Sequence, residues 1–192
     1  VVECDQVLPI ARYPGNAIQV RFASQGENLV WATDQALHFQ AVKPKANATL
    51  VKQPGIFQIS TSRDGRFLAY AQIKKLYASD YDEAIGRASS KTVIALLDRE
   101  KDLSVSLSEK IEATCVAISE DGSVLLAGCE DGTVHAFSGR SRRELAVLAG
   151  HTEEVSAICV SGDGLSAVSG SRDGSLRTWN LASWSVAAVL SL

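Results

Sequence analysis

The strongest constraint in this sequence is a pair of Asp-Gly dipeptides that recurs at a fixed distance. Asp121-Gly122 returns as Asp163-Gly164, and Asp131-Gly132 returns as Asp173-Gly174, each 42 residues later. Glycine is favoured in tight hairpin turns because those turns need a positive φ angle. Two independent turns that keep one period therefore predict a repeated unit of short strands joined by turns.

Each repeat is predicted to hold four short β-strands. Apolar residues follow the 42-residue shift, since Val116 matches Ile158 and Phe137 matches Trp179. No segment keeps a 3.6-residue apolar period for more than two turns, which argues against helices. In the last repeat we expect strands near 154–160, 165–170, 175–180 and 184–190. Four strands in a repeat of about 40 to 45 residues are typical of one blade of a β-propeller.

Two further repeats are predicted upstream. Arg63-Asp64-Gly65 has the form of a first turn, but it lies 57 residues before Asp121. An insertion of about 17 residues, over 73–91, restores the period. A weaker repeat begins near Ala17, with Gln25-Gly26 at its first turn. The predicted division is an N-terminal segment or outer strand of a neighbouring blade (1–15), a degenerate blade (16–53), a degenerate blade with the inserted loop 73–91 (54–109), a clearer blade (110–149) and the most regular blade (150–192).

The last repeat carries a motif that points to a family. Gly150-His151 is followed by Ser169-Gly170-Ser171-Arg172-Asp173-Gly174-Ser175-Leu176-Arg177-Thr178-Trp179-Asn180. This pattern closely resembles a WD40 repeat, with Trp-Asn in place of the name-giving Trp-Asp. The repeat before it resembles a degenerate member, and the two upstream repeats match the family mainly by phase. The resemblance implies an all-β fold, a β-propeller of four-stranded antiparallel blades.

The resemblance also implies a buried chain of hydrogen bonds in the last blade. The residues that it assigns to this chain are Trp179, Ser169, His151 and Asp173. Their chemistry fits, because an indole only donates, a hydroxyl donates and accepts, and an imidazole can bridge a hydroxyl to a carboxylate. The corresponding positions of the preceding blade hold Phe137, Ala127, Glu109 and Asp131. Only the turn residue Asp131 is kept there, so we expect that blade to rest on apolar packing.

The number of blades predicts an incomplete propeller. The chain holds about four blades, whereas the family usually closes a ring of about seven. An open ring exposes sheet faces and rims that β-proteins normally cover. The sequence also contains no methionine. We expect the chain to be part of a longer propeller, with closure by another chain as the alternative and a self-contained ring of four blades as the least favoured arrangement.

The insertion at 73–91 is the first candidate for partner binding. Its candidate contact residues are Lys74, Lys75, Tyr77, Tyr81 and Arg87. Loops carried on a rigid scaffold are where recognition usually resides. A partner-binding loop and an excursion without function are therefore both open at this point.

A second candidate is the basic turn formed by Arg140, Arg142 and Arg143, between the third and fourth strands of one blade. The chain has a net charge of −3, and no aromatic platform stands beside this turn. Because nucleic-acid binding depends on excess positive charge and on stacking, a solvated hairpin tip is favoured over a nucleic-acid contact.

The sequence favours a protein without catalytic chemistry. His151, Ser169 and Asp173 are the residue types of a hydrolase triad, but the WD40 pattern already uses all three, and no GxSxG turn is present. His38 and His135 lie near aromatic residues on predicted third strands. The four cysteines lack zinc spacing and are expected to be small buried residues. We predict no catalytic residue, no metal site and no cofactor.

The function predicted from the resemblance is a non-catalytic WD40 scaffold for protein–protein interaction, a subunit of a multiprotein assembly. Its expected partners are other proteins. The alternatives are a propeller that binds RNA or a basic histone-like tail, and a non-catalytic subunit of an enzyme complex. Apolar stretches are far shorter than the roughly 20 residues of a membrane span. Unpaired cysteines and the absence of a secretion signal favour the cytoplasm or the nucleus.

Overall fold

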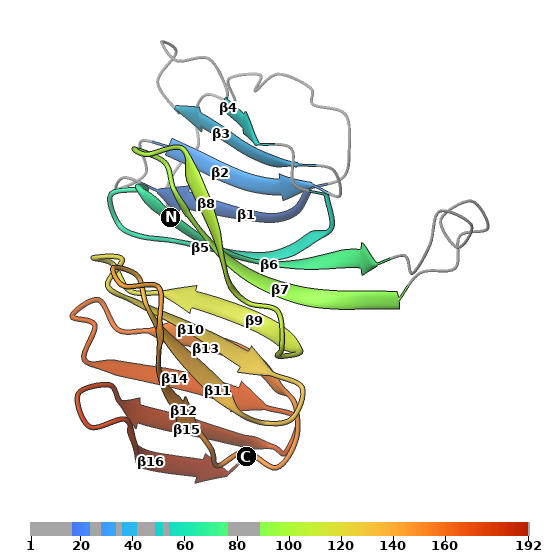
Figure 1. Ribbon diagram of the computed structural model, residues 1–192. Helices are drawn as coiled ribbons and strands as arrows, with labels where there is room; N and C mark the ends of the chain where they lie inside the picture. The colour runs from blue at the N-terminus through green and yellow to red at the C-terminus, as the bar shows by residue number, and fades with distance from the viewer. Residues whose placement is uncertain are drawn as a thin grey trace, which may run out of the picture.

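The computed structural model describes residues 17–23, 28–33, 36–41, 49–51, 54–76 and 89–191. These residues form strands and turns without a helix, and the strands assemble into four antiparallel sheets of four strands each (Figure 1). The all-β class and the four-stranded blades predicted from the repeat are thus confirmed. In each sheet, strands that follow one another in the chain are hydrogen-bonded neighbours.

Each sheet is built from one repeat. The first contains β1 (Ala17–Ala23), β2 (Asn28–Thr33), β3 (Leu37–Ala41) and β4 (Thr49–Val51). The second contains β5 (Ile56–Thr61), β6 (Phe67–Leu76), β7 (Ser89–Asp98) and β8 (Leu103–Ser108). The third contains β9 (Ala113–Ile118), β10 (Val124–Cys129), β11 (Val134–Ser138) and β12 (Glu144–Leu148). The fourth contains β13 (Val155–Val160), β14 (Ser166–Ser171), β15 (Ser175–Asn180) and β16 (Ser185–Ser191).

The sheets pack against one another in chain order. The innermost strand β5 contacts β1 on one side and β9 on the other, and β9 contacts β13 in turn. Hydrogen bonds also cross between sheets, from the Arg63 N–H to the Glu120 carbonyl (2.8 Å) and from the Ile118 N–H to Ser60 Oγ (3.1 Å). The four blades form an open row, with the first and fourth sheets at its two ends (Figure 1).

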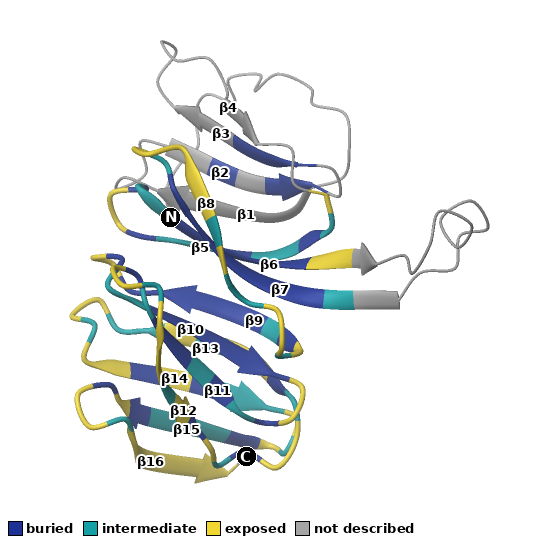
Figure 2. Cartoon of the chain, viewed as in Figure 1, coloured by how far each residue is buried: buried dark blue, intermediate teal, exposed yellow. Residues whose placement is uncertain are grey.

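Apolar clusters fill the three spaces between adjacent sheets. The first includes Val30 and Leu68, the second includes Leu125 and Ile94, and the third includes Trp179. The buried residues lie mainly on the strands that are sandwiched between neighbours (Figure 2). Each fully buried aliphatic or aromatic side chain contributes roughly 1.5–3 kcal/mol, so the faces of adjacent sheets stabilise one another.

The first turn of the last three blades is one structure used three times. Ser62, Ser119 and Ser161 each donate a side-chain hydrogen bond, of 2.5–2.7 Å, to the aspartate two residues later. Each serine Oγ also accepts a hydrogen bond, of 2.9–3.0 Å, from the N–H five residues later. The glycines Gly65, Gly122 and Gly164 all have a φ of 70°. The sequence reasoning found the Asp-Gly pair but missed the serine that completes the motif.

The structure corrects the limits of the predicted insertion 73–91. Strand β6 continues to Leu76 and β7 begins at Ser89, with Ile73 paired to Thr92 and Leu76 paired to Ser89. The two arms of the insertion therefore form a hairpin, because pairing satisfies backbone N–H and C=O groups that a loop would leave to solvent. This hairpin extends beyond the other sheets (Figure 1). Residues 77–88 lie outside the described residues.

One apolar face of the fourth sheet is uncovered. Leu126 and Leu148 of the third sheet are 0% and 2% exposed because the fourth sheet covers them. Val168 and Leu190 occupy the same places one repeat later, and they are 37% and 59% exposed. The repeat thus presents at its end a face of the kind that it buries elsewhere.

This face predicts self-association of the chain, because contiguous exposed apolar surface drives contact between molecules. We expect size-exclusion chromatography with light scattering to give a mass above 20.5 kDa. Val168→Lys combined with Leu190→Lys should move the mass toward that of one chain. Leu103→Lys, which replaces an exposed leucine of β8, should not. A single-chain mass for the unmodified protein would contradict the prediction.

Candidate functional site

A chain of side-chain hydrogen bonds runs through the fourth sheet. The Trp179 indole N–H donates to Ser169 Oγ at 2.8 Å. Ser169 Oγ lies 2.8 Å from His151 Nε2, and His151 Nδ1 lies 2.9 Å from Asp173 Oδ2. Because the indole can only donate, every group is satisfied when the hydroxyl donates to Nε2 and the Nδ1–H donates to the carboxylate.

These four residues come from separate elements of the same sheet. Trp179 lies on β15, Ser169 on β14, His151 before β13, and Asp173 in the turn between β14 and β15. Ser169 is 0% exposed, and the indole and imidazole rings meet edge to face at 6.3 Å. The chain of bonds therefore links the inner strands of the sheet inside the protein.

Asp173 has more partners than the sequence reasoning assigned to it. Its Oδ1 accepts hydrogen bonds from the Ser175 N–H (2.8 Å) and the Ser175 hydroxyl (2.6 Å). Its Oδ2 also accepts from the Thr152 N–H at 3.0 Å. These bonds, led by that from the Ser175 side chain, hold the pKa of Asp173 well below its ordinary value of 3.8. The signal that was missed is the hydroxyl residue two places after the turn aspartate.

The third sheet keeps only part of this arrangement. Asp131 Oδ1 accepts bonds from the Thr133 N–H (2.9 Å) and the Thr133 hydroxyl (2.6 Å), which lower the pKa of Asp131. Phe137 is buried in the apolar cluster beneath its strand, and Ala127 is buried beside it. Glu109 instead pairs with Lys91 at 3.1 Å. Apolar packing of Phe137 and Ala127 in the third sheet therefore replaces the hydrogen bonds that Trp179 and Ser169 make in the fourth.

The second sheet is held by an ion pair between Arg66 and Asp98 that the sequence reasoning missed. Arg66 Nε and Nη2 each lie 3.2 Å from one carboxylate oxygen of Asp98, and Arg66 Nη1 lies 2.7 Å from Glu100. Asp98 is 3% exposed, and the bonds from Arg66 lower the pKa of this carboxyl. A bidentate pair of this kind fixes geometry as well as charge. Asp98 ends β7 as Asn180 ends β15, which is the signal that could have located it.

The other two histidines also have structural partners. His38 on β3 is buried, with Nε2 at 3.2 Å from Thr33 Oγ1, and burial lowers the pKa of its imidazole. His135 on β11 places Nδ1 2.5 Å from Glu144 Oε1 and stacks its ring on Phe137, with centroids 6.4 Å apart. Both side chains thus make contacts within their own sheets.

The cysteines only partly follow the expectation of burial. Cys115 and Cys129 are buried thiols, and burial raises the pKa of Cys129 to about 12. Cys159 is exposed, on the uncovered side of the row, which corrects the prediction for that residue. Cys4 lies outside the described residues. Within the described ranges, no group of three or more metal-ligating side chains is brought together.

The residues of the predicted partner-binding loop are described only in part. Lys74 and Lys75 lie on β6, and the Lys74 side chain is exposed. Tyr77, Tyr81 and Arg87 lie outside the described residues.

The predicted basic turn connects β11 to β12. Arg140 and Arg143 are exposed, whereas Arg142 is half-buried and has a φ of 60°. The Arg142 N–H donates to the Ser138 carbonyl at 2.8 Å, and the Ser138 N–H donates to the Arg143 carbonyl at 2.8 Å. These bonds hold the turn as a closed hairpin tip.

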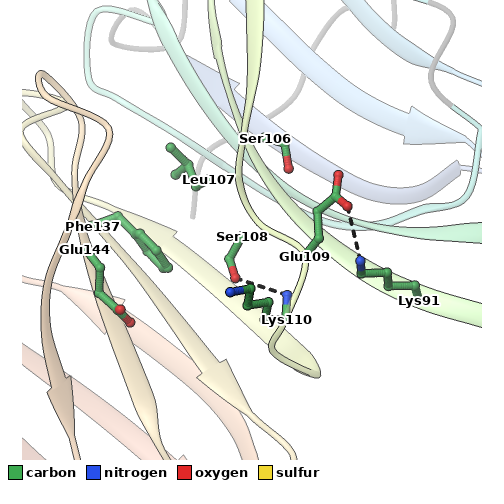
Figure 3. A pocket seen from close by; sticks show the side chains of 8 residues that line it. All are labelled: Lys91, Ser106, Leu107, Ser108, Glu109, Lys110, Phe137 and Glu144. Carbon is green, nitrogen blue, oxygen red and sulfur yellow. Dashed lines mark hydrogen bonds and ion pairs between the residues drawn. The ribbon is translucent and has the colours of Figure 1, made fainter.

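A groove between the second and third sheets is a candidate site that the sequence reasoning did not find. It has a volume of about 590 Å³. The outer strand β8 and the residues after it form one side, and β11 and β12 form the other (Figure 3). The lining residues are Lys91, Ser106, Leu107, Ser108, Glu109, Lys110, Phe137 and Glu144. Strands from two repeats make this groove, so no pattern within one repeat could reveal it.

The buried hydrogen-bond chain predicts a large effect of Ser169→Ala. The change leaves the Trp179 N–H and His151 Nε2 without their partner, so we expect the free energy of unfolding to fall by about 1–3 kcal/mol. Urea denaturation measures this. Ser166→Ala, at an exposed position of the same strand, should change it by less than about 0.5 kcal/mol. Equal effects of the two substitutions would contradict a stabilising role for the chain.

The two turn aspartates should differ in a pH-dependent way. Asp173→Ala should lower stability more than Asp131→Ala at pH 7, because Asp173 also binds His151 and Thr152. The pKa of Asp173 is lowered in the folded protein, so its contribution is present above its ordinary pKa of 3.8 and is lost as the pH falls through the folded value. The difference in the free energy of unfolding between the Asp173→Ala and Asp131→Ala variants should therefore shrink below about pH 4 in denaturation curves recorded from pH 7 to pH 2. An excess independent of pH would show that charge is not involved.

Comparisons with known proteins agree with this architecture. Residues 105–138 and 142–180 match the family model described as WD domain, G-beta repeat. The first match begins in the outer strand β8 and the second begins two residues before the outer strand β12, and each ends in the third strand of the next sheet. A search of curated proteins gave no match. In the described part of the chain, no helix has the length and apolar character needed to cross a membrane. Residues 105–138 and 142–180 therefore carry WD40 repeats, and the four-stranded antiparallel sheets agree with blades of a β-propeller.

Proposed function

We propose that this protein is a non-catalytic scaffold that binds other proteins within a multiprotein assembly. WD40 repeats are typical of interaction scaffolds. The observation that carries the proposal is that the sheets are held together by buried interactions while parts of their outer surface are accessible. Buried bonds and apolar clusters hold the sheets together, while a groove and an extended hairpin present accessible side chains at the outside. Such an arrangement suits recognition by a rigid body.

The residues that could suggest hydrolysis support the scaffold instead. The Ser169 hydroxyl is fully buried and already bonded to Trp179 and His151. A nucleophile must reach the substrate, so this serine is placed for stability. His38 and His135 have their own partners in Thr33 and Glu144. These contacts favour a non-catalytic protein over an enzyme.

The β6–β7 hairpin is proposed as one partner-binding element. Lys74 is exposed where the hairpin leaves the sheet, and the residues proposed to contact the partner are Lys74, Lys75, Tyr77, Tyr81 and Arg87. The basic turn at Arg140, Arg142 and Arg143 is proposed as a solvated tip. We place the protein in the cytoplasm or nucleus, where thiols such as Cys115 and Cys129 stay reduced.

Shortening the hairpin tests the scaffold function. Replacing residues 77–88 with a short Gly-Ser turn keeps the paired residues of β6 and β7, so we expect an unchanged melting temperature. Proteins captured from an extract by the full chain should be reduced several-fold for the shortened chain, as measured by quantitative mass spectrometry. A control replacement of the exposed residues Lys101 and Asp102 in the β7–β8 turn by Ser-Gly should leave capture unchanged.

The same preparations separate a scaffold from an enzyme. Hydrolase activity present in the isolated chain and lost in His38→Asn or His135→Gln would overturn the scaffold proposal. Failure of the full chain to capture any protein above the level of a chain unfolded by Ser169→Ala and heat would also overturn it.

A further inference from the structure

The first strands of all four sheets begin with the same irregularity. In each sheet the register between the first and second strands shifts at the start of β1, β5, β9 or β13. The residue that the second strand places next to this shift is small in every sheet. We call these residues the small positions: Ala32, Ala71, Gly128 and Gly170.

The first strand of the next sheet covers three of the small positions. At two junctions the small position shares a buried cluster with the residue that begins that strand: Ala32 with Ile56, and Ala71 with Ala113. At the third junction Val155 covers Gly128, where an added Cβ would lie 2.6 Å from Val155 Cγ1 and 2.7 Å from Cys115 Sγ. A normal contact between carbon atoms is roughly 3.5 Å, so Val155 packs there because Gly128 has no side chain.

A hydroxyl group holds the same valine by its backbone. The Thr114 side chain on β9 donates a hydrogen bond to the Val155 carbonyl and lies 3.1 Å from the Gly128 carbonyl. The junction therefore recognises Val155 twice, through its side chain on a glycine and through its carbonyl at a hydroxyl.

The fourth sheet repeats both features on its uncovered side. An added Cβ at Gly170 would meet only Leu176 Cδ2, at 3.2 Å. Ser156 corresponds to Thr114 one repeat later, is exposed, and donates to the Gly170 carbonyl at 3.3 Å. In the described part of the chain, no residue lies here as Val155 lies at the preceding junction. The site for the first residue of another inner strand is therefore formed and open.

The uncovered side is as wide as a complete sheet. Val168 on β14 and Leu190 on β16 are 37% and 59% exposed, and β16 is exposed along its length (Figure 2). Neighbouring strands lie about 4.8 Å apart, so β14 and β16 are about 10 Å from each other. A single extended strand cannot cover both. In the third sheet, the equivalent residues Leu126 and Leu148 are buried against the fourth sheet.

A second copy of the same face does not complete this site. Val155 points toward the third sheet, so two fourth sheets placed face to face would not supply an aliphatic residue at Gly170. The self-association predicted from the exposed apolar face therefore rests on apolar area and does not use Gly170.

We propose that the uncovered side of the fourth sheet docks a four-stranded antiparallel blade of a partner protein. The inner strand of that blade begins with a branched aliphatic residue, whose side chain lies on Gly170 and whose carbonyl accepts a hydrogen bond from Ser156. The other strands of the blade cover Val168 and Leu190. The proposal rests on the scaffold function and assigns to it one surface and the structural class of one partner.

An added blade tests this recognition. Residues 150–192 are joined a second time after residue 191, which continues the 42-residue spacing, and Cys159 of the added copy is replaced by Ala. Cys159 of the original chain is exposed on the uncovered side, whereas Ala117, 42 residues earlier, is 5% exposed. We therefore expect the added blade to slow alkylation of Cys159 by iodoacetamide at least tenfold, as measured by mass spectrometry at low micromolar concentration.

Two substitutions in the original chain test the site residues. Gly170→Val occupies the space of the incoming side chain, so it should restore fast alkylation of Cys159 in the presence of the added blade. Ser156→Ala removes the hydroxyl and should raise the rate at least threefold. Ser106→Val, which introduces valine at an exposed position of β8, should leave the slow rate unchanged. If Gly170→Val unfolds the chain without the added blade, as seen by circular dichroism, Ser156→Ala decides.

The partner is sought with the full 192-residue chain, in which Cys4 is replaced by Ser and Cys159 carries a benzophenone maleimide. After irradiation in a cell extract, we expect crosslinks to the first strand of a four-stranded antiparallel blade of another protein, and their loss with Gly170→Val. Crosslinks only between copies of this chain, crosslinks to a helical segment, or no crosslinks would overturn the proposal.

The remaining outcomes distinguish this proposal from the scaffold function. Alkylation that the added blade does not slow, or slow alkylation indifferent to the deciding substitution, would overturn the docking site. Neither result involves the β6–β7 hairpin, so protein capture that depends on residues 77–88 would keep the scaffold function. Loss of capture by the folded chain, combined with fast alkylation in the presence of the added blade, would remove both.

Discussion

Burial of each sheet face against the next sheet is the constraint on which the rest of this structure depends. A four-stranded sheet with apolar residues on both faces is not stable in water, because each face must be covered. Leu126 is fully buried because the fourth sheet covers it. Val168, the equivalent residue one repeat later, is exposed because no described residue covers it. Stability is therefore a property of neighbouring pairs, as in other repeat proteins.

Because packing between sheets holds the row together, the interior of each blade can vary. The third strand is fixed by Trp179 and its hydrogen bonds in the fourth sheet, by the buried Phe137 in the third, and by the Asp98–Arg66 ion pair near its end in the second. The first turns of the second, third and fourth sheets each keep an aspartate that accepts a backbone N–H: Asp64, Asp121 and Asp163. The turn sets the register of the hairpin, which tolerates little change.

The features that could be predicted from the sequence are those that depend on local spacing. Asp-Gly turns need a positive φ, so the repeat and its strands could be predicted from the paired turns at Gly122, Gly132, Gly164 and Gly174 and from the apolar positions that follow the same 42-residue shift. The ion pair of Arg66 with Asp98 joins residues 32 positions apart in the one blade whose period is broken by an insertion, so the 42-residue spacing does not reveal it. Its one signal is that Asp98 ends β7 as Asn180 ends β15. The extension of β6 to Leu76 was hidden for a similar reason, since polar lysines on a solvent-facing hairpin look like a loop.

The groove has no signature of its own in the sequence, because its two sides belong to different sheets. Leu107 resembles an ordinary outer-strand residue and Phe137 an ordinary core residue, and only the packing of the second sheet on the third brings them to one space. The same rule applies to any repeat protein: residues within a repeat maintain the blade, while residues at the junction of two repeats create surfaces that neither has alone. In this chain the inserted hairpin breaks the regular period of the second repeat, and Lys91 at its base also lines the junction. Variation in one repeat therefore changes the surface available to a partner without disturbing the buried bonds that hold its neighbours.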